Sequence, residues 1–460
     1  MHSLIYFDVE DSFSHPGSPV HRLPGQFADI LHAEGLQGSF HIIGEKARFM
    51  ERHRQQDVID AIRRHDVSLH YDRGSLPPTT ATEVSNLGWF DGVERVMFRE
   101  RTGFDTIERV FGRCTALTQH GGTFAAQIVY AVGKMGKPYF YSPFQLGRRN
   151  VVWYANNLMF RGLHGDLYFD TLYRDTAAFD HEFTQVDGRI AELARTVDYS
   201  PMFGCHPVIT MMTEFPCANF FGGAAPPRAQ WRVPTPVPGV WVPTILANFR
   251  RYVHALAKQP DVSWTTVAGM TEIYGQRPII VGDHAILAGA RAVIDQGGPA
   301  YTDVLSAGEL LYLLARRRLQ QRDRCDVPQV MGPTESHPPV RSFADAEAIA
   351  TAIVDAVDAS SYLPADIDLA NAIVHLACAS VGRDAMSATR TITDLPGMDT
   401  AMERIRSYRD WPVHGPAYRQ ESILMHAELQ AWTLKPAMPA SDYPPDVTLG
   451  RQLNPMVPWR

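Results

Sequence analysis

Residues 4–11 read Leu4-Ile5-Tyr6-Phe7-Asp8-Val9-Glu10-Asp11, a short apolar run that ends in three carboxylates. Aliphatic and aromatic residues in a run of this length predict a buried β-strand. Further runs of the same kind follow at residues 38–43, 67–71, 116–119, 138–141, 202–205 and 262–267. Helical patterns separate several of them, at residues 25–34, 58–65, 92–102 and 126–136. Strands that alternate with helices predict parallel pairing through crossovers. We therefore expect an α/β fold, a distorted (β/α) barrel of about seven parallel strands over residues 1–278.

The second part of the chain has a different pattern. From about residue 280 the sequence is rich in Ala, Leu and Val at helical spacing, and strand-like runs disappear. Segments 283–295 and 345–357 resemble each other, and each precedes a more apolar helix, at 306–318 and 368–380, which makes a weak two-fold repeat. We expect an all-helical domain over residues 279–435 and an extended Pro-rich tail over 436–460. A Pro-rich stretch at 226–243 is predicted to be a loop over the barrel rim.

Composition excludes several classes of protein. The 460 residues carry a net charge of −7, with 45% apolar and 20% charged residues, as in ordinary globular domains. No basic block or Arg stripe with interleaved aromatics indicates nucleic acid as a partner. No apolar window approaches the ~18 residues of a membrane span, and the N-terminal residues do not resemble a signal peptide. The five cysteines are scattered, without a CxxC pair. We expect a cytoplasmic protein, and the sequence leaves self-association open.

Reactive side chains collect at the ends of the predicted strands. The first strand ends in Asp8, Glu10 and Asp11, and the late strand at 202–205 is followed by His206. Two more strand ends present His70 with Asp72, and Gln119 with His120. Barrels of this type place their chemistry at the carboxyl ends of the strands. An isolated Asp there often only caps the next turn, but three carboxylates within four residues repel one another unless a cation or a proton balances them.

These residue types suit metal-assisted hydrolysis. Carboxylate oxygens and imidazole nitrogens from different strands can hold a divalent metal with one position open for water. The bound water becomes a nucleophile near neutral pH. A second carboxylate can accept its proton, and a histidine on the other side can protonate the leaving group.

With these strand ends, residues 1 to about 275 resemble the polysaccharide deacetylase (NodB-homology, carbohydrate esterase 4-like) superfamily. The segment Phe7–Asp11 is similar to the first motif of that family in its Asp-x-Glu-Asp form, and the segment Phe203–Pro207 is similar to its late His motif. The resemblance implies Asp8 as the general base and His206 as the acid. It also implies that Asp11 or Glu10, together with His70, holds a divalent metal, zinc in that family. The implied reaction is hydrolysis of an N-acyl group, usually N-acetyl, from an amino sugar or a related small amide.

Two positions depart from the family pattern. The family usually has a second metal-binding His about four residues after the first, where this chain has Gly74. The third motif usually has an Arg that orients the base, where this chain has Thr118. His120 or Asp72 could replace the missing ligand. The alternatives are a metal-free cyclic-amide hydrolase like allantoinase and a degenerate barrel that binds a carbohydrate or a protein without catalysis.

The substrate expected from this interpretation is a small molecule or a carbohydrate. Asp72 and Gln119 lie at strand ends beside the predicted metal ligands, and Trp153 and Tyr154 lie in a predicted loop where they could stack on a sugar ring. We therefore predict four substrate-binding residues: Asp72, Gln119, Trp153 and Tyr154.

Overall fold

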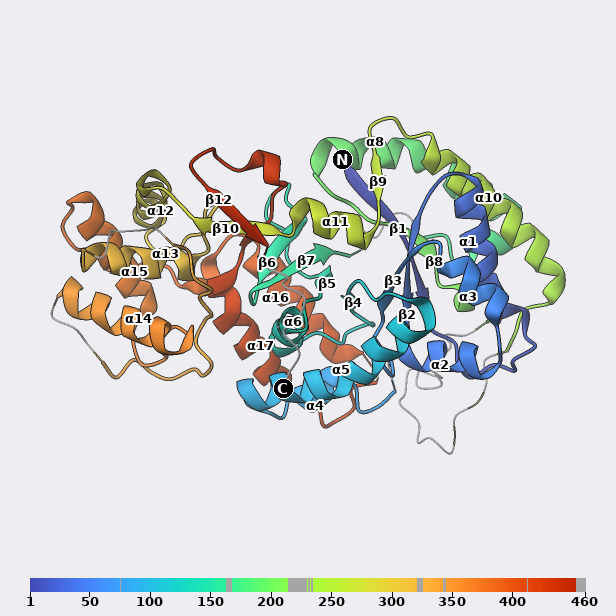
Figure 1. Ribbon diagram of the computed structural model, residues 1–460, viewed down its shortest axis with the longest axis horizontal. Helices are drawn as coiled ribbons and strands as arrows, with labels where there is room; N and C mark the ends of the chain where they lie inside the picture. Colours follow the sequence, from blue (N-terminus) through green and yellow to red (C-terminus); the bar gives the residue numbers. More distant parts are fainter. Residues whose placement is uncertain are drawn as a thin grey trace.

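A computed structural model describes the chain except residues 75, 163–167, 214–229, 231, 233–234, 321–325, 342–344, 412 and 452–460. It shows a curled, mostly parallel sheet wrapped by helices, with a helical region beside it (Figure 1). The α/β class and the barrel-like sheet with an adjoining helical region are therefore as predicted.

Seven strands form a continuous parallel run within the sheet. In sheet order they are β7 (Asn157–Arg161), β5 (Tyr139–Ser142), β4 (Leu117–Thr118), β3 (Asp66–Leu69), β2 (Gly38–Ile42), β1 (His2–Val9) and β8 (Met202–Cys205). A further strand, β9 (Ser263–Thr265), pairs in parallel with the start of β1. All seven predicted strand segments therefore contain a strand of the sheet.

A hairpin extends the sheet beyond the predicted strands. Strand β6 (Val151–Tyr154) pairs antiparallel with β7, and the turn residues Ala155 and Asn156 have φ of +45° and +52°. Two consecutive positive φ values are typical of the tight turns that join hairpin strands. Strand β11 (Lys435–Pro436) then pairs antiparallel with β6 at the edge of the sheet.

The sheet curls into a barrel because its inner side chains meet across the interior. Tyr6 on β1 and Tyr141 on β5 are separated by three strands in the sheet order, yet their hydroxyl groups lie 2.9 Å apart. The inner core includes Leu4, Phe140 and Phe160. Since side chains alternate between the two faces of a strand, residues Asp8 and Glu10 follow Tyr6 toward the inside of the barrel.

Helices cover the outer face of the sheet, and an aromatic layer lies beneath them. The rings of Phe7 and Phe40 stack with centroids 4.7 Å apart, and Phe27 and Phe249 pack at 4.3 Å. The α-helices of this region are α1 (Leu23–Ala33), α2 (Gly44–Arg52), α3 (Gln56–Ile62), α4 (Thr80–Val84), α5 (Trp89–Phe111), α6 (Ala126–Lys134), α7 (Thr176–Phe183), α8 (Val186–Thr196), α9 (Pro207–Met211), α10 (Val242–Ala257) and α11 (Val267–Tyr274). Short 3-10 helices lie at Pro19–His21, Leu172–Arg174, Gly239–Trp241, Ile392–Asp394, Tyr408–Asp410, Gln430–Thr433 and Ala440–Asp442.

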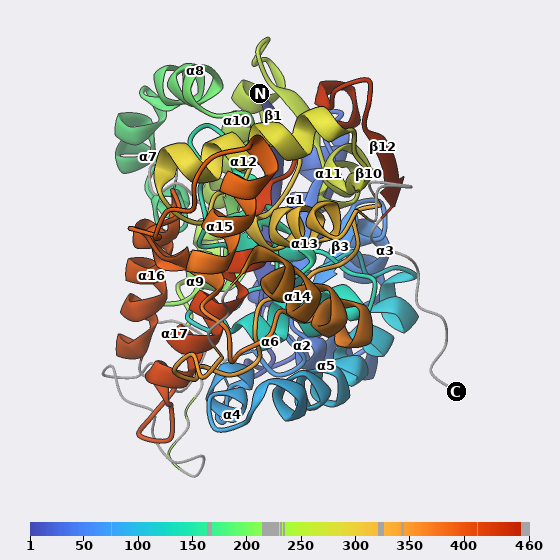
Figure 2. The same ribbon diagram turned by 90° about the vertical axis from the view of Figure 1, so that its left-hand side faces the viewer.

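The helical region has its own apolar core. Its helices α12 (Asp283–Gln296), α13 (Ala307–Arg318), α14 (Ala346–Ser360) and α15 (Leu369–Val381) coincide with the four segments of the predicted repeat. Figure 2 shows them grouped in front of the barrel. The N-termini of α13, α14 and α15 are capped by side chains, with a capping box between Ser306 and Glu309 and single caps from Asp345 and Asp368.

The segment after residue 392 packs against the barrel. The predicted helical domain, which extends to residue 435, is therefore too long at its C-terminal end. Helices α16 (Met398–Ser407) and α17 (Gln420–Leu429) bury Met398, Ile405 and Ile423 in the same core as the outer face of the sheet. Strand β12 (Thr448–Arg451) then pairs with β10 (Gln276–Ile280) within the predicted tail, whose last residues, 452–460, lie outside the described part. Pro226, Pro227 and Pro234 of the predicted rim loop also lie outside it.

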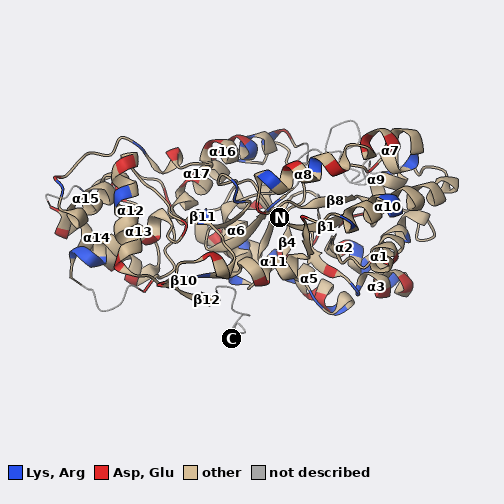
Figure 3. Ribbon diagram, turned by 90° about the horizontal axis from the view of Figure 1, so that it is seen from above, with Lys and Arg blue, Asp and Glu red and all other residues tan. Residues whose placement is uncertain are grey.

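The distribution of charge and apolar surface agrees with the composition. Lys and Arg alternate with Asp and Glu around both the barrel and the helical region (Figure 3). Within the described ranges, no helix is both long enough and apolar enough to cross a membrane.

Candidate active site

One cavity at the barrel rim contains most of the predicted catalytic residues. Its volume is about 220 Å³. Because β1, β3, β4, β5 and β8 are parallel, their carboxyl ends meet at this rim. The cavity is lined by Asp8, Glu10, His70, Gln119, His120, Gly121, Tyr141, His206 and Trp411. The sequence had suggested five of these as catalytic or metal-binding residues.

Glu10 is the centre of a buried carboxylate–imidazole cluster. Its Oε1 lies 3.3 Å from Nε2 of His70 and 3.1 Å from Nε2 of His120. Burial alone would raise the pKa of Glu10, but His120 holds this pKa below its usual range. In the described part of the chain, Glu10 Oε2 and His120 Nδ1 are buried without a hydrogen-bond partner. Buried polar atoms are rarely left in this way unless a water or an ion completes the site.

The tautomer of His70 follows from its contacts with Thr118. The Thr118 Oγ1 donates to the carbonyl oxygen of Leu69 at 3.2 Å, so it accepts from His70 Nδ1 at 2.8 Å. The Thr118 carbonyl oxygen is a second acceptor for the same nitrogen, at 3.3 Å. The Nδ1 of His70 therefore carries the proton, and in the neutral ring Nε2 presents a lone pair.

That lone pair faces negative charge. His70 Nε2 lies 3.3 Å from Glu10 Oε1 and 3.9 Å from Asp8 Oδ1. Burial lowers the pKa of His70 despite the raising effect of Asp8 and Glu10, so the neutral ring is favoured near pH 7. A lone pair that points at two carboxylates is repelled unless a cation lies between them. The arrangement therefore fits a bound metal ion.

Two sets of residues offer ligand atoms close enough for one ion. Glu10, His70 and His120 form the first set, and Asp8, Glu10 and His206 form the second; in each set the ligand atoms lie within 4.8 Å of one another. One carboxylate and two imidazoles are ligands that zinc accepts in catalytic sites. The first set fits a metal better, because His206 is held in its protonated form.

His206 is oriented and charged by a buried aspartate. Asp170 Oδ2 accepts from Nδ1 of His206 at 2.7 Å, and Asp170 Oδ1 accepts from the backbone N–H of His206 at 2.6 Å. Burial would lower the pKa of His206, but Asp170 raises this pKa to about 9. The imidazolium therefore persists at neutral pH, with Nε2 3.6 Å from Asp8 Oδ2.

Asp8 is a carboxylate surrounded by imidazoles. His41, its register partner on β2, donates from Nδ1 to Asp8 Oδ1 at 3.1 Å. Burial would raise the pKa of Asp8, but the surrounding imidazoles lower it, and among them His41 donates a hydrogen bond and His206 is charged. Asp8 is therefore ionised at neutral pH and able to accept a proton.

Asp11 lies away from the cavity, which corrects its assignment as a metal ligand. Its Oδ1 accepts from the backbone N–H groups of Phe13, at 2.9 Å, and Ser14, at 3.2 Å, so it caps the turn after β1. The period of two along β1 and the residue after it directs Asp8 and Glu10 inward, whereas Asp11 is out of phase with that period. Glu10, the alternative ligand, is the one that faces His70.

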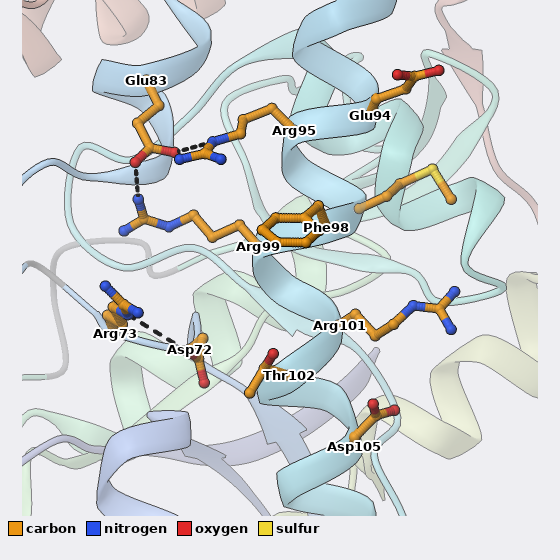
Figure 4. A pocket seen from close by; sticks show the side chains of 11 residues that line it. Asp72, Arg73, Glu83, Glu94, Arg95, Phe98, Arg99, Arg101, Thr102 and Asp105 are labelled. Atoms are coloured by element: carbon orange, nitrogen blue, oxygen red, sulfur yellow. Dashed lines mark hydrogen bonds and ion pairs between the residues drawn. The ribbon is translucent and has the colours of Figure 1, made fainter.

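Asp72 also points elsewhere, so it is neither a substitute ligand nor a substrate contact in this cavity. Its Oδ1 accepts from Arg48 Nη1 at 2.7 Å. It lines a separate groove along α5 of about 630 Å³, shown in Figure 4, where Arg95 and Arg99 pair with Glu83. Several of the charges that line this groove form ion pairs with one another.

Trp153 and Tyr154 are buried and cannot stack on a substrate. They belong to β6, where Trp153 pairs with Lys435 of β11 and the Tyr154 hydroxyl donates to the carbonyl oxygen of Ala427 at 2.9 Å. Both side chains are among the largest fully buried ones. Gln119 does line the cavity, and its amide donates to the carbonyl oxygen of Gly121.

Four residues of the site were not anticipated. His41 could have been found, because inward alternation along β2 places it opposite Asp8. Tyr141 lies at a register shift in β5 and has φ of +95°, which the local sequence does not predict. Asp170 and Trp411 come from segments without strand periodicity. The Trp411 ring lies 5.6 Å from that of His120.

The known proteins that resemble this chain are solved structures. No family model matches the sequence, and no curated protein matches it either. A structure described as a polysaccharide deacetylase from Mycobacterium smegmatis is similar at 12% identity and a TM-score of 0.38, over 59% of this chain and 88% of that chain. The Puue allantoinase is similar at 10% identity and a TM-score of 0.37, over 59% and 90%. A pseudoenzyme of the CE4 family is similar at 9% identity and a TM-score of 0.32, over 58% and 66%. Because these identities and TM-scores are low, the architecture is described from the observed strand order, and the chemistry is argued from the geometry of the candidate active site.

Proposed function

We propose that this chain is a metal-dependent hydrolase of a C–N amide bond that removes an acyl group, acetyl in the simplest case, from an amino sugar or a related small N-acyl compound. The observation that carries the proposal is the buried cluster of Glu10, His70 and His120, whose ligand atoms lie within 4.8 Å of one another. Glu10, His70 and His120 would hold the ion, zinc by ligand type. When bound, the ion supplies a Lewis acid that polarises the acyl oxygen and lowers the pKa of water.

The remaining side chains divide the proton transfers between them. Asp8, ionised and held by His41, accepts the proton of the attacking water. Water adds to the acyl carbon, and the C–N bond breaks. His206, charged through Asp170, donates its Nε2 proton to the departing nitrogen. The products are a carboxylic acid and a free amine.

The size of the cavity supports a small acyl group. A volume of about 220 Å³ leaves room for an acetyl group and part of one sugar ring. Trp411 provides an aromatic surface at the cavity beside His120. Aromatic rings at this kind of site pack well against the apolar face of a sugar.

The test is acetate release from a panel of N-acetyl sugars and small ureides, with zinc-loaded and chelator-treated protein. We expect hydrolysis of at least one N-acetyl compound that is lost on chelation and in His206→Ala and Asp8→Asn. Hydrolysis that survives chelation would instead identify a metal-free hydrolase. Absence of both metal binding and turnover would identify a binding module.

A further inference from the structure

A pair of arginines lies on the same rim as the candidate active site. Arg161 is the last residue of β7, and Arg404 lies on α16. Strand β7 is parallel to β5, so Arg161 ends at the rim where Tyr141 lines the cavity. Neither arginine forms an ion pair with a carboxylate within the part of the chain that the structure describes. Most other arginines near the barrel do so, as Arg48 does with Asp72.

Arg161 holds donor atoms that nothing satisfies. Its Nε and Nη1 are buried and have no hydrogen-bond partner among the described residues. The backbone next to it is pressed against the cavity wall, because a Cβ added at Gly162 would lie 2.3 Å from the Tyr141 ring. A guanidinium whose donors are buried without acceptors loses its hydration without compensation. This position therefore lacks an acceptor.

Arg404 lies near the same part of the rim. Its Nε donates to the hydroxyl of Tyr408 at 3.2 Å. A Cβ added at Gly122, next to the cavity residue Gly121, would lie 3.1 Å from Cβ of Tyr408, so Arg404 lies beside the rim of the cavity. Tyr141 thus lies next to Arg161 in the sheet and lines the cavity together with Asp8 and Glu10.

The two guanidinium groups repel each other. Burial first, and then the charge of Arg404, lowers the pKa of Arg161 to about 10. Two close cations without a carboxylate are unfavourable unless an anion joins them. Arginine is the side chain best suited to bind phosphoryl or carboxylate oxygens, because its planar fork donates two parallel hydrogen bonds.

We propose that Arg161 and Arg404 bind an oxyanion, phosphoryl or carboxylate, that the N-acyl substrate carries. This inference rests on the proposed amide hydrolysis for the identity of the substrate, but the oxyanion site itself does not. It narrows the substrate to acidic N-acyl compounds such as phosphorylated or carboxylated amino sugars. The groove along α5 has no such role, because Glu83 already pairs with Arg95 and Arg99.

The first experiment measures substrate preference with three matched compounds: N-acetylglucosamine, its 6-phosphate and N-acetylglucosaminuronate, whose carboxylate is at the same ring substituent as the phosphoryl group. We expect kcat/KM to be at least tenfold higher for one of the two charged compounds, and the stronger one identifies the oxyanion. Arg161→Gln and Arg404→Gln should each reduce this preference at least tenfold, through KM. Arg406→Gln is the matched control, because Arg406 is exposed on the same helix and should keep the preference.

The second experiment measures binding without catalysis. Inorganic phosphate is titrated calorimetrically into the full chain in the presence of a chelator, and thermal unfolding confirms that each variant folds. We expect binding by the native chain and by Arg406→Gln, and a loss of at least tenfold in the other two variants. If phosphate binds as expected but no N-acyl compound is hydrolysed, the proposed function fails and the oxyanion site stands. Equal phosphate binding by all four proteins, or no binding by any, would overturn the inference.

Discussion

Thr118→Val removes the hydroxyl group that orients His70 and leaves a side chain of nearly the same shape. Thr118 is fully buried, and its Oγ1 lies 2.8 Å from His70 Nδ1. Loss of a group that orients a metal-binding histidine typically costs about 10- to 100-fold in metal affinity. We expect zinc affinity to fall by about tenfold, the lower end of this range, because the Thr118 carbonyl oxygen, 3.3 Å from His70 Nδ1, still accepts a hydrogen bond from that nitrogen. Tenfold corresponds to about 1.4 kcal/mol.

The assay is the zinc dissociation constant, measured by competition with a chromophoric chelator. Thr123→Val is the matched control, since Thr123 is equally buried and its Oγ1 has no hydrogen-bond partner among the described residues. Thermal unfolding shows whether both variants fold. If Thr118→Val binds zinc as tightly as Thr123→Val, the tautomer argued for His70 is wrong.

Three further predictions concern other parts of the structure. Asp11→Ala should leave the zinc affinity unchanged. In denaturant titrations it should lower the free energy of unfolding by about 1 kcal/mol, because two turn hydrogen bonds are lost. A loss of zinc binding in this variant would show that Asp11 is a ligand. The acid His206 loses its proton as the pH rises through its pKa of about 9, so the reaction rate should fall above that pH. Asp170→Asn should move this fall in rate to lower pH. A fall at the same pH in Asp170→Asn as in the native chain would contradict the role of Asp170. Lys435→Met should destabilise the fold by about 3 kcal/mol, since it removes the closer of the two cations that pair with the buried Glu309, at 2.6 Å, and leaves only Arg277 at 3.9 Å. Glu309→Gln added to Lys435→Met should recover part of the loss, and calorimetric unfolding that shows no difference would contradict this.

Much of the barrel could be predicted from hydrophobic runs alone. A strand buried on both faces is apolar along its whole length, so the strands of the parallel sheet are visible in the sequence. The β6–β7 hairpin was missed because its strands follow a stretch of polar and basic residues, Gln145–Asn150, that looks like a loop. For this reason Trp153 and Tyr154 were predicted to contact a sugar, whereas they are core residues.

The site was predictable only where strand geometry determines it. The period of two along β1 separates Asp8 and Glu10 from Asp11, and the same argument applied to β2 would have found His41. No local pattern reveals that Trp411 and Arg404 reach this rim, because both residues lie in the segment that follows the helical region, far in the sequence from the strands that form the rim. Only the tertiary packing of α16 against the barrel brings them there.

The location of the metal is the central claim, and anomalous X-ray scattering from crystals soaked in zinc tests it most directly. We predict one zinc ion per chain, bound by Glu10, His70 Nε2 and His120 at about 2.0–2.2 Å, with Asp11 still capping its turn. A zinc ion at Asp11, or no ion at the rim when these three side chains are intact, would contradict the account.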